Sequence, residues 1–279
     1  MGAEQSGTFE IGGDITVNRL AFGAMRVTGD GVIGEPDDVE EAKTVLRRAV
    51  ESGVNFIDTA DSYGPGVSER LIREELAPYG DVTVATKGCL VRRPDGEWIR
   101  NGDPDYLKNA ALCSVDRLGV DTIDLYQLHR FDEDVPNEDS LNALAELKDE
   151  GYIEHIGLSE VSVEELGEAR DIVEVATVQN RYNVGDREHD DVVDYCENND
   201  IGFMPWFPIA SGNLAAKEEA LTEVAEAHDA TVYQVALAWL LERSPVMLPI
   251  PGTGNVEHLE ENVAAAGIDL TDEDMEKLD

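Results

Sequence analysis

The chain has 279 residues, of which 60 are acidic and 21 basic, so its formal net charge is −39 at pH 7. A charge of this size repels phosphate backbones and anionic membranes, which disfavours nucleic-acid binding and membrane-surface binding as functions. No apolar run approaches the length of a membrane span, and the three cysteines lack the spacing of a metal site, which favours reduced thiols in a cytoplasm.

The first predicted element is a β-hairpin near the N-terminus. The runs Thr8–Ile11 and Ile15–Val17 flank the sequence Gly12-Gly13-Asp14, which is typical of a tight turn between two strands. We expect this hairpin to cover the bottom of the barrel that the rest of the chain predicts.

Eight short apolar runs follow at intervals of roughly 20 to 45 residues, which leaves room for a helix between neighbours. Strands that alternate with helices in this way predict an α/β fold with a parallel sheet, and eight of them predict a closed (β/α)8 barrel, or TIM barrel. Such a barrel takes about 250 residues, so we expect residues 1–279 to form a single domain. The predicted strands are Arg19–Phe22, Val54–Ile57, Val82–Thr86, Ile123–Leu128, Ile153–Leu158, Ala176–Val178, Ile201–Met204 and Val246–Ile250.

Helix signals agree with this alternation. Three of the intervening segments carry apolar residues on one helical stripe, so each can bury one face against the sheet. Pro104 suits a first helical turn, and two sequence pairs fit capping boxes at helix N-termini. These pairs are Ser162 with Glu165 and Thr271 with Asp274.

Four residues that can bind or release a proton lie just beyond three successive predicted strands. Asp58 follows the strand that ends at Ile57, and Tyr63 lies in the next loop. Lys87 and His129 each follow the strand ahead of them. Because the carboxyl ends of neighbouring parallel strands lie side by side, we expect these side chains to converge on one cleft.

The four residues suit proton transfer to a carbonyl oxygen. A tyrosine has a pKa of about 10, but an adjacent ammonium stabilises the phenolate, so we expect Lys87 to bring the pKa of Tyr63 toward neutrality. Asp58 offers the ammonium a partner, and His129 can hydrogen-bond a substrate oxygen and direct it toward the phenol. None of the four can donate hydride, so carbonyl reduction here requires a nicotinamide cofactor.

Each of these residues has a simpler interpretation when it is taken alone. Asp58 and Lys87 would then be an ordinary ion pair of the barrel, because such networks also perturb pKa values. Tyr63 would be a loop residue, and His129 a hydrogen-bonded surface histidine. Their joint placement after consecutive strands favours catalysis over these alternatives.

Along nearly its whole length the chain resembles the aldo-keto reductases. The segment Asn55–Gly64 is similar to the family's aspartate and tyrosine motif, Ala85–Lys87 to its lysine motif and Asp124–His129 to its histidine motif. Val235–Leu240 is similar to the branch that contains bacterial pyridoxal reductases. The segments that resemble the family's cofactor-binding sequences are Gly157–Ser159, Gln179–Asn183, Ile250–Thr253 and Glu261–Asn262.

The resemblance implies a role for each matching catalytic residue. Tyr63 would be the general acid in reduction, Lys87 and Asp58 would tune its acidity, and His129 would orient the carbonyl. The resemblance implies a larger set of cofactor contacts along the chain. This set comprises Gly23, Met25, Asp58, Ser159, Gln179, Trp206, Phe207, Ile209, Gly212, Leu214, Pro251, Gly252, Thr253, Glu261 and Asn262.

Within this set the resemblance separates the two ends of the cofactor. Ser159 and Gln179 would hold the carboxamide, and Trp206 would stack on the nicotinamide ring. The range 207–214 would cover the pyrophosphate, and the range 251–253, with the helix that follows it, would surround the adenosine end.

Two departures from the family pattern affect the cofactor. Glu160 occupies the position where the family usually has asparagine, which leaves one expected hydrogen bond to the carboxamide unaccounted for. Gly252 and His258 stand where relatives that bind a 2′-phosphate often have lysine and arginine. Thr253, Asn255 and the amides of a helix that starts near Asn255 remain as anion ligands. We therefore expect NADPH, with NADH as the alternative.

The loop Gly88–Pro104 gathers cations in a chain that is otherwise poor in them. One hypothesis is that the loop overhangs the cleft and favours an anionic or polar aldehyde, with Trp98 closing over it. The alternative is local pairing of its arginines with Asp95, Glu97 and Asp103. The three arginines are Arg92, Arg93 and Arg100, and the predicted substrate pocket comprises Arg92, Arg93, Trp98 and Phe131.

We predict an NADPH-dependent oxidoreductase that reduces an aldehyde or ketone to an alcohol. Oxidation of an alcohol or sugar is one alternative, because the same residues work in reverse. A nicotinamide-binding regulatory subunit, as some barrels of this family are, is another, whereas an acidic decoy for basic partners would leave the ordered motifs unexplained. We expect a small-molecule carbonyl substrate, no nucleic acid, membrane or metal, and a monomer or weak homo-oligomer.

The acidic residues also predict a response to salt. They are spread through the predicted helices, as in Asp37-Asp38-Val39-Glu40-Glu41, and the composition resembles that of haloarchaeal proteins. The Debye length is about 3 Å at molar salt, so such a surface would lose most of its repulsion there while it stays solvated. We expect a halophilic protein whose folding needs concentrated salt.

Overall fold

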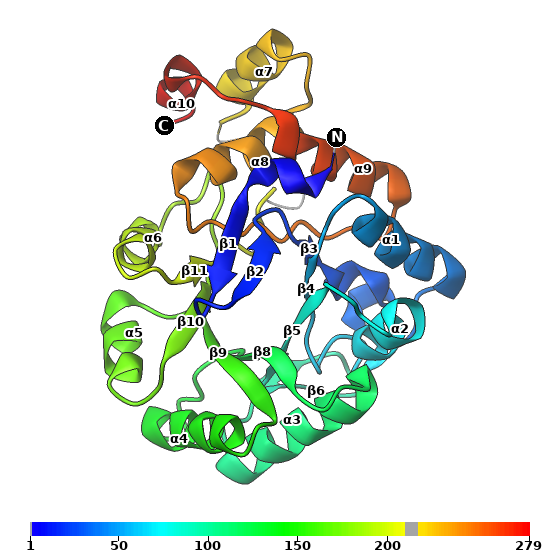
Figure 1. Ribbon diagram of the computed structural model, residues 1–279, viewed down its shortest axis with the longest axis vertical. Coiled ribbons are helices and arrows are strands. Elements are labelled where there is room, and N and C mark those ends of the chain that lie inside the picture. Colours follow the sequence, from blue (N-terminus) through cyan, green and yellow to red (C-terminus); the bar gives the residue numbers. More distant parts are fainter. Residues whose placement is uncertain (1, 210–216) are drawn as a thin grey trace.

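The computed structural model describes residues 2–209 and 217–279; a short 3-10 helix, Ala3–Ser6, is followed by the predicted hairpin (Figure 1). β1 (Thr8–Ile11) and β2 (Ile15–Asn18) pair antiparallel. Asp14 in the connecting turn lies 2.7 Å from Nε2 of His155, which is near the start of a barrel strand. Gly12 packs so closely that a Cβ at its position would lie 2.0 Å from the His155 ring. The hairpin therefore covers the end of the sheet where the strands begin.

Seven parallel strands form the central sheet, in the spatial order β3, β4, β5, β8, β9, β10, β11. This order follows the chain, as successive βα units require. The sheet curls, and the parallel sheet with its hairpin confirms the predicted fold class. The strands are β3 (Phe22–Gly23), β4 (Phe56–Asp58), β5 (Thr83–Gly88), β8 (Ile123–Leu128), β9 (Ile153–Ser159), β10 (Val175–Gln179) and β11 (Gly202–Phe203).

The segment 246–251 links the two edges of this sheet. On one side, Phe203 of β11 exchanges backbone hydrogen bonds of 2.8 and 2.7 Å with the segment. On the other side, the amides of Ala21 and Gly23 donate to its carbonyls over 3.0 and 3.1 Å. The backbone thus closes the ring that the sequence predicts, with the eighth position filled by an irregular segment.

The predictions for the two ends of the ring need correction. Val246–Ile250 is not a regular strand, because Pro249 and the following Pro251 have no N–H group and their carbonyls can only accept hydrogen bonds. At the other end, the predicted strand Arg19–Phe22 is displaced, and the regular strand is Phe22–Gly23.

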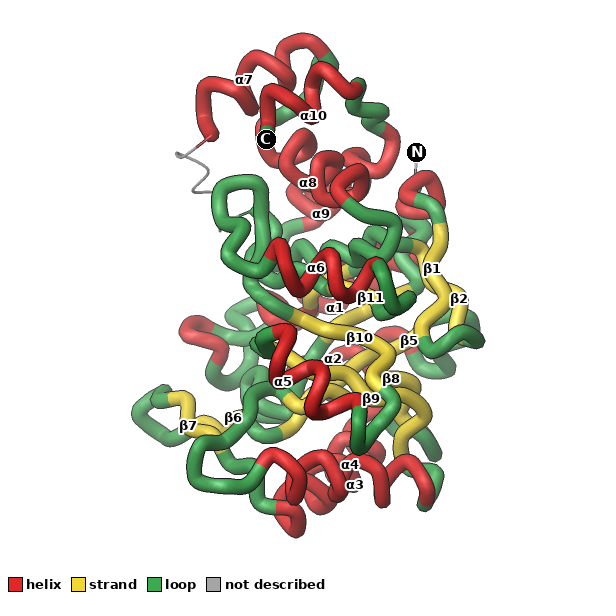
Figure 2. Tube along the Cα trace, turned by 90° about the vertical axis from the view of Figure 1, so that its left-hand side faces the viewer, coloured by secondary structure: helices red, strands yellow, loops and turns green. Residues whose placement is uncertain are grey.

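Helices form an outer layer around the sheet (Figures 1 and 2). Pro104 is the first residue of its helix, and both predicted capping boxes are present, at Ser162 and Thr271. The α-helices of the described ranges are α1 (Val39–Glu51), α2 (Val67–Leu76), α3 (Pro104–Leu118), α4 (Asn137–Asp149), α5 (Val163–Arg170), α6 (Asp190–Glu197), α7 (Glu218–Ala227), α8 (Val232–Arg243), α9 (Val256–Ala264) and α10 (Asp272–Leu278).

A smaller apolar cluster fills the inside of the barrel and sets the direction of the polar side chains above it. Phe56 of β4 and Ala85 of β5 belong to this inner cluster. Because alternate residues of a strand face the same side, Asp58 and Lys87, two positions further on, also point into the barrel. The alternation of side chains along the strands therefore places the Asp58 carboxylate and the Lys87 ammonium together inside the barrel, above the apolar cluster.

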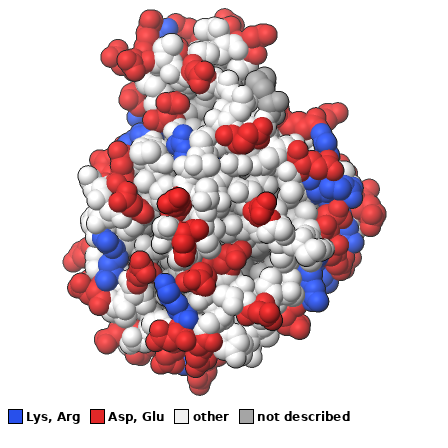
Figure 3. Space-filling view, in the orientation of Figure 1, with Lys and Arg blue, Asp and Glu red and all other residues white. Residues whose placement is uncertain are grey.

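The outer surface is dominated by acidic side chains. Figure 3 shows Asp and Glu spread over the hairpin face of the molecule, with fewer Lys and Arg among them. Among the helices that the structure describes, none is long and apolar enough to cross a membrane.

Candidate active site

A cleft of about 860 Å³ opens where the barrel strands end. Gly23, Asp58 and Gln179 are the last residues of β3, β4 and β10, and all three line it. Its volume lies at the upper end of the range for small-molecule and cofactor sites. The lining residues are Gly23, Met25, Arg26, Asp58, Tyr63, Leu90, Trp98, Arg100, His129, Arg130, Gln179, Trp206, Phe207, Pro208, Ile209, Tyr233, Ile250, Gly252, Thr253, His258, Glu261 and Asn262.

A buried ion pair lies at the floor of the cleft. Nζ of Lys87 donates to Oδ2 of Asp58 over 2.6 Å and to the carbonyl of Thr59 over 2.8 Å, and the lysine side chain is fully buried. Oδ1 of Asp58 accepts from Nε2 of Gln127 and of Gln179, each at 2.9 Å. Both charges are thus paired and hydrogen-bonded, which offsets much of their desolvation cost. Gln127 was not predicted as a site residue, although it lies two positions after Leu125, the residue of β8 that belongs to the inner cluster.

Tyr63 lies above this pair. Its ring centroid is 5.2 Å from Nζ of Lys87 and 6.0 Å from the His129 ring, and the residue is only 7% exposed. Trp98 meets the tyrosine edge-on at 6.5 Å. The structure therefore brings together the four residues predicted to act on a proton, and they lie at one side of one cleft. These residues are Asp58, Tyr63, Lys87 and His129.

The pKa of Tyr63 differs from the sequence-based expectation. Burial is the largest effect and raises the pKa of the phenol, while the Lys87 ammonium lowers it by a smaller amount and Asp58 raises it further. The expectation that Lys87 would bring this pKa toward neutrality was wrong, because the sequence did not reveal how completely the ring is buried. The raised pKa keeps the phenol protonated at neutral pH, which is the form that can donate a proton.

His129 is a neutral imidazole in this setting. Burial, the Lys87 ammonium and the Arg130 guanidinium all hold the pKa of His129 well below its usual value. Only 6% of the residue is exposed, and its Nδ1 has no hydrogen-bond partner within the described residues. A neutral imidazole can donate one hydrogen bond, so His129 can bind an oxygen in the cleft without adding a charge.

Arg130 lines the cleft and was not predicted. Its Nη1 donates to the carbonyl of His129 over 2.5 Å and to Oγ of Ser159 over 2.8 Å. Burial lowers the pKa of the guanidinium. Its place directly after His129 was the only sequence signal, and that signal does not reveal which way a side chain points.

Glu160, the departure from the family pattern, contacts the aromatic wall of the cleft. Its Oε1 accepts from Nε1 of Trp206 over 2.5 Å and from the amide of Arg181 over 2.8 Å. The residue has a φ of +59°, a left-handed conformation that is costly for a non-glycine residue. Trp206 also packs edge-on against Phe207 at 5.6 Å. The carboxylate thus fixes the indole for which the family resemblance predicts a place against the nicotinamide.

The opposite end of the cleft is formed by close backbone approaches. A Cβ on Gly23 would lie 2.6 Å from the carbonyl of Ile250, and a Cβ on Gly252 would lie 2.4 Å from the carbonyl of Gly23. Thr253 and Asn262 line this end too. Most of the predicted cofactor residues therefore border the cleft. Exceptions are Ser159 and Pro251, which lie beside it, and Gly212 and Leu214, which fall outside the described residues.

The loop after Lys87 forms a small antiparallel hairpin, β6 (Leu90–Arg92) and β7 (Trp98–Arg100). Trp98 lines the cleft as predicted. The guanidinium of Arg92 instead lies 3.7 Å from the Trp98 ring centroid and donates to three backbone carbonyls. Arg93 pairs with Glu97 at the surface.

The predicted substrate pocket therefore needs revision. Arg92, Arg93 and Phe131 are not among the residues that line the cleft, and Phe131 packs against the outer core. Arg93 forms the local ion pair with Glu97 that the alternative predicted. Arg92 instead packs against the Trp98 ring and holds it in place through its contacts with the backbone.

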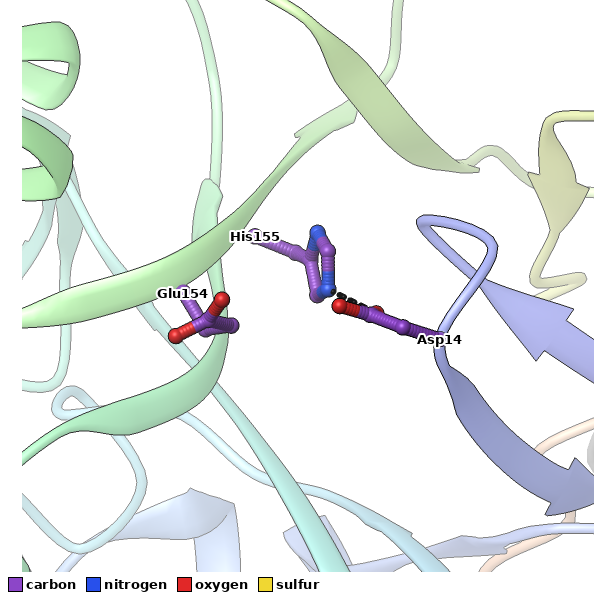
Figure 4. A group of neighbouring side chains, drawn as sticks. All are labelled: Asp14, Glu154 and His155. Atoms are coloured by element: carbon purple, nitrogen blue, oxygen red, sulfur yellow. Dashed lines mark hydrogen bonds and ion pairs between the residues drawn. The ribbon is translucent and has the colours of Figure 1, made fainter.

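A second ionisable group lies at the other end of the barrel. Ligand atoms of Asp14, Glu154 and His155 fall within 4.8 Å of one another. Figure 4 shows Asp14 facing the His155 ring, with Glu154 on the other side of it. Because the Asp14–His155 contact joins the hairpin turn to β9, we interpret the group as a structural anchor.

The chain is similar to known proteins along nearly its whole length. The model of the aldo/keto reductase family matches residues 19–279. An uncharacterised oxidoreductase of Schizosaccharomyces pombe is 52% identical over 277 residues, which cover 99% of this chain and 90% of the relative. Pyridoxine 4-dehydrogenase of Escherichia coli is 43% identical over 281 residues, covering 98% of each chain.

Solved structures give the same result. A thermostable aldo-keto reductase, determined with the inhibitor epalrestat, is similar with a TM-score of 0.86, 31% identity and coverage of 97% of this chain and 98% of the other. An aldo/keto reductase from Klebsiella pneumoniae in complex with NADP and acetate has a TM-score of 0.83 at 25% identity, covering 97% and 93% of the two chains.

Proposed function

The chain belongs to the aldo/keto reductase family of NAD(P)-dependent oxidoreductases, and from that premise we propose that it reduces an aldehyde or ketone with NADPH. The observation that carries this proposal is the buried Asp58–Lys87 pair beneath the Tyr63 ring, with His129 beside it, at one cleft. An ordinary barrel ion pair would not need a tyrosine and a neutral histidine above it.

The residues of the cleft fit a nicotinamide dinucleotide. Gly23 and Gly252 line the cleft, and because neither residue has a side chain, the two backbone segments that carry them can pack directly against each other at its wall. Gln179 would hold the carboxamide from the wall of the cleft, with Ser159 beside the cleft as a second partner, and Trp206 would pack against the ring. When it is bound, the nicotinamide supplies the hydride that no side chain of this protein can supply.

In the proton step, Tyr63 gives its phenolic proton to the carbonyl oxygen of the substrate. Lys87 stabilises the phenolate that remains, because its ammonium lies close to the ring. Asp58 keeps the ammonium in place, and His129 donates a hydrogen bond that orients the carbonyl. General acid catalysis of this kind contributes about 10²- to 10⁴-fold to a rate.

The preference for NADPH over NADH is supported by a cation that the sequence analysis did not consider. Arg26 lines the cleft, and its carbonyl oxygen lies near Gly254, next to the start of α9. No carboxylate of the described residues forms an ion pair with it. We assign Arg26 to the phosphates of the cofactor, together with Thr253 and the amides of Val256 and Glu257 in the first turn of α9, whereas Asn255 caps the amide of His258.

Oxidation of an alcohol is a second candidate direction for the same site. One relative at 43% identity is named pyridoxine 4-dehydrogenase, and pyridoxine is an alcohol. The phenolate of Tyr63 would then accept the proton that it donates in reduction. The regulatory-subunit alternative predicts cofactor binding without turnover.

A panel assay tests the proposal. Short aliphatic aldehydes, benzaldehydes and pyridoxal are offered with NADPH and with NADH, and the corresponding alcohols with NADP⁺ and NAD⁺, all in concentrated KCl. We expect turnover of at least one aldehyde class with NADPH and a higher Michaelis constant for NADH.

Arg26→Gln should raise the Michaelis constant for NADPH several-fold and that for NADH much less. Binding of NADPH with no turnover across the panel would support the regulatory alternative instead.

A further inference from the structure

We infer that the preferred aldehyde carries a negatively charged group, and that Arg130, assisted by Arg100, binds this group at the substrate end of the cleft. The inference rests on the proposed function and names a substrate class for the same site. It also replaces the sequence-based hypothesis that assigned this role to Arg92 and Arg93.

The hydrogen bonds of Arg130 leave part of its guanidinium free. A guanidinium has five N–H donors, and among the described residues only Nη1 of Arg130 is engaged, with the His129 carbonyl and the Ser159 hydroxyl. Arg92 and Arg19, which also bind uncharged acceptors, each engage two nitrogens. Nε and Nη2 of Arg130 therefore remain available in a residue that lines the cleft.

Arg130 also lacks a counterion. No carboxylate oxygen of the described residues lies within 4.0 Å of its side-chain nitrogens, although the chain has 60 acidic residues and 21 basic ones. Burying a charge without an opposite charge is costly. The Glu160 carboxylate, which raises the pKa of Arg130, is already engaged by Trp206 and the Arg181 amide. A substrate with a negatively charged group would supply the counterion that Arg130 lacks, and it would offset the cost of burying the guanidinium.

The position of Arg130 relative to the reaction centre fits a small substrate. Its charge acts on both Tyr63 and His129, lowering the pKa of the imidazole and opposing the rise in the phenol's pKa. The positive charge of Arg100, which lines the same cleft, in turn lowers the pKa of Arg130. Arg130 and Arg100 thus line the same cleft as the proton donor.

Arg100 and Trp98 complete the substrate end. The partner of Arg100 is Glu133, whose side chain is 88% exposed, so this pair is solvent-screened and weak. Trp98 lies edge-on to Tyr63 and offers an apolar surface to the body of a substrate. A compound with its carbonyl at Tyr63 and a carboxylate a few bonds away would contact all of these groups. Guanidinium groups bind carboxylates especially well, because two N–H donors can match two oxygens.

The test compares two nearly isosteric aldehydes, 4-formylbenzoate and its uncharged methyl ester. The measured quantity is the ratio of their kcat/KM values in one preparation with one cofactor at one salt concentration, so losses common to both substrates cancel. We expect the natural sequence to prefer the acid by at least tenfold. Arg130→Gln should lower this ratio by about tenfold, which corresponds to about 1.4 kcal/mol. 4-Formylphenyl phosphate, as a third arm, distinguishes a phosphate-bearing substrate from a carboxylate.

Two further variants serve as controls. Arg100→Gln should lower the ratio by roughly two- to threefold, as a weaker contact at the cleft mouth. Arg93→Gln removes an equal charge from the same loop but outside the cleft, and it should leave the ratio unchanged. Arg130→Lys keeps a cation and should retain part of the preference, which separates loss of charge from loss of folding in the glutamine variant.

The outcomes are distinct. Equal falls in kcat/KM for acid and ester in Arg130→Gln would overturn the inference and make Arg130 a positioning residue for His129 and Ser159. A preference for the ester in the natural sequence would also overturn it. Absence of turnover with every aldehyde would remove the proposed function and this inference together, whereas turnover with an unchanged ratio would remove the inference alone.

Discussion

Charged groups serve different ends in the cleft and on the outer surface. In the cleft, Asp58 and Lys87 are almost fully buried, and every polar atom of the pair has a partner. On the surface, pairs such as Arg93–Glu97 are about half exposed, and most acidic residues are exposed to solvent. Exposed pairs contribute about 0–1 kcal/mol, whereas breaking a buried pair costs about 3–5 kcal/mol. The surface thus sets the response to solvent, and the few buried charges set the chemistry.

Replacing Lys87 by methionine should have the largest effect. The substitution leaves Asp58 buried without a counterion, so we expect a loss of about 3–5 kcal/mol in the free energy of unfolding. Turnover should fall by about 100-fold or more, because the phenolate of Tyr63 loses its stabilising charge. Chemical unfolding and steady-state kinetics measure the two effects.

A double variant separates these two roles of the pair. Adding Asp58→Asn to Lys87→Met removes the unpaired charge, so most of the stability should return while turnover stays low. If the double variant were as unstable as the single one, uncompensated charge would not be the reason for the loss.

The surface should respond to salt as a whole. Raising KCl from low to multimolar concentration should raise the melting temperature by roughly 10 °C or more, equivalent to about 3–5 kcal/mol for a chain of this size. Differential scanning calorimetry checks this. A melting temperature that does not change with salt would mean that the acidic surface is not under repulsive strain. Sodium chloride at matched ionic strength is the control for a potassium-specific effect.

Asp61 offers a smaller test, since it is a buried carboxyl without the partners that Asp58 has. Its Oδ1 has no hydrogen-bond partner within the described residues, and burial raises the pKa of Asp61 to about 8. A raised pKa means that the folded state binds more protons than the unfolded state between pH 4 and 8, so this group destabilises the protein increasingly as pH rises through that window.

Asp61→Asn should therefore be more stable than the natural sequence at pH 8, and the difference should shrink on going to pH 5.5. We expect the change across this range to be on the order of 2–4 kcal/mol. Unfolding curves of both proteins at several pH values give it directly. A difference independent of pH would show that Asp61 is ionised in the folded state.

Glu160→Gln should have the smallest effect. The change removes the negative charge from the two hydrogen bonds that hold Trp206 and the Arg181 amide, each of which is stronger with an ionised acceptor. We expect NADPH to bind about five-fold more weakly, or about 1 kcal/mol, with little change in kcat. Quenching of tryptophan fluorescence measures the binding. Unaltered affinity would mean that the indole needs no anchor.

The sequence predicted the sheet well where its strands are buried and regular. The apolar run 123–128 coincides with β8, because a buried strand with no proline leaves a clear pattern. The run 246–250 failed as a strand, since Pro249 removes one of the N–H groups that a ladder needs. Asp58 and Lys87 were found because each lies where a predicted strand ends, and neighbouring parallel strands end side by side whatever rotamers their side chains adopt.

The rest of the site depends on side-chain direction and burial depth, which strand periodicity does not determine. Arg130 follows His129 but turns toward Ser159, and Arg92 turns away from the cleft to clamp Trp98. The pKa of Tyr63 rises because the ring is sealed from solvent by neighbours far apart in the chain. Each of these outcomes is set by packing between distant segments.

The central claim is that Tyr63 supplies the proton at this cleft. Tyr63→Phe keeps the ring and removes the hydroxyl, so it should bind NADPH within about twofold of the natural affinity. Its single-turnover rate of aldehyde reduction should fall by about 10²- to 10⁴-fold. Measured together by stopped-flow fluorescence, retained binding with lost turnover supports the account. A variant that reduces the aldehyde within about tenfold of the natural rate would contradict it.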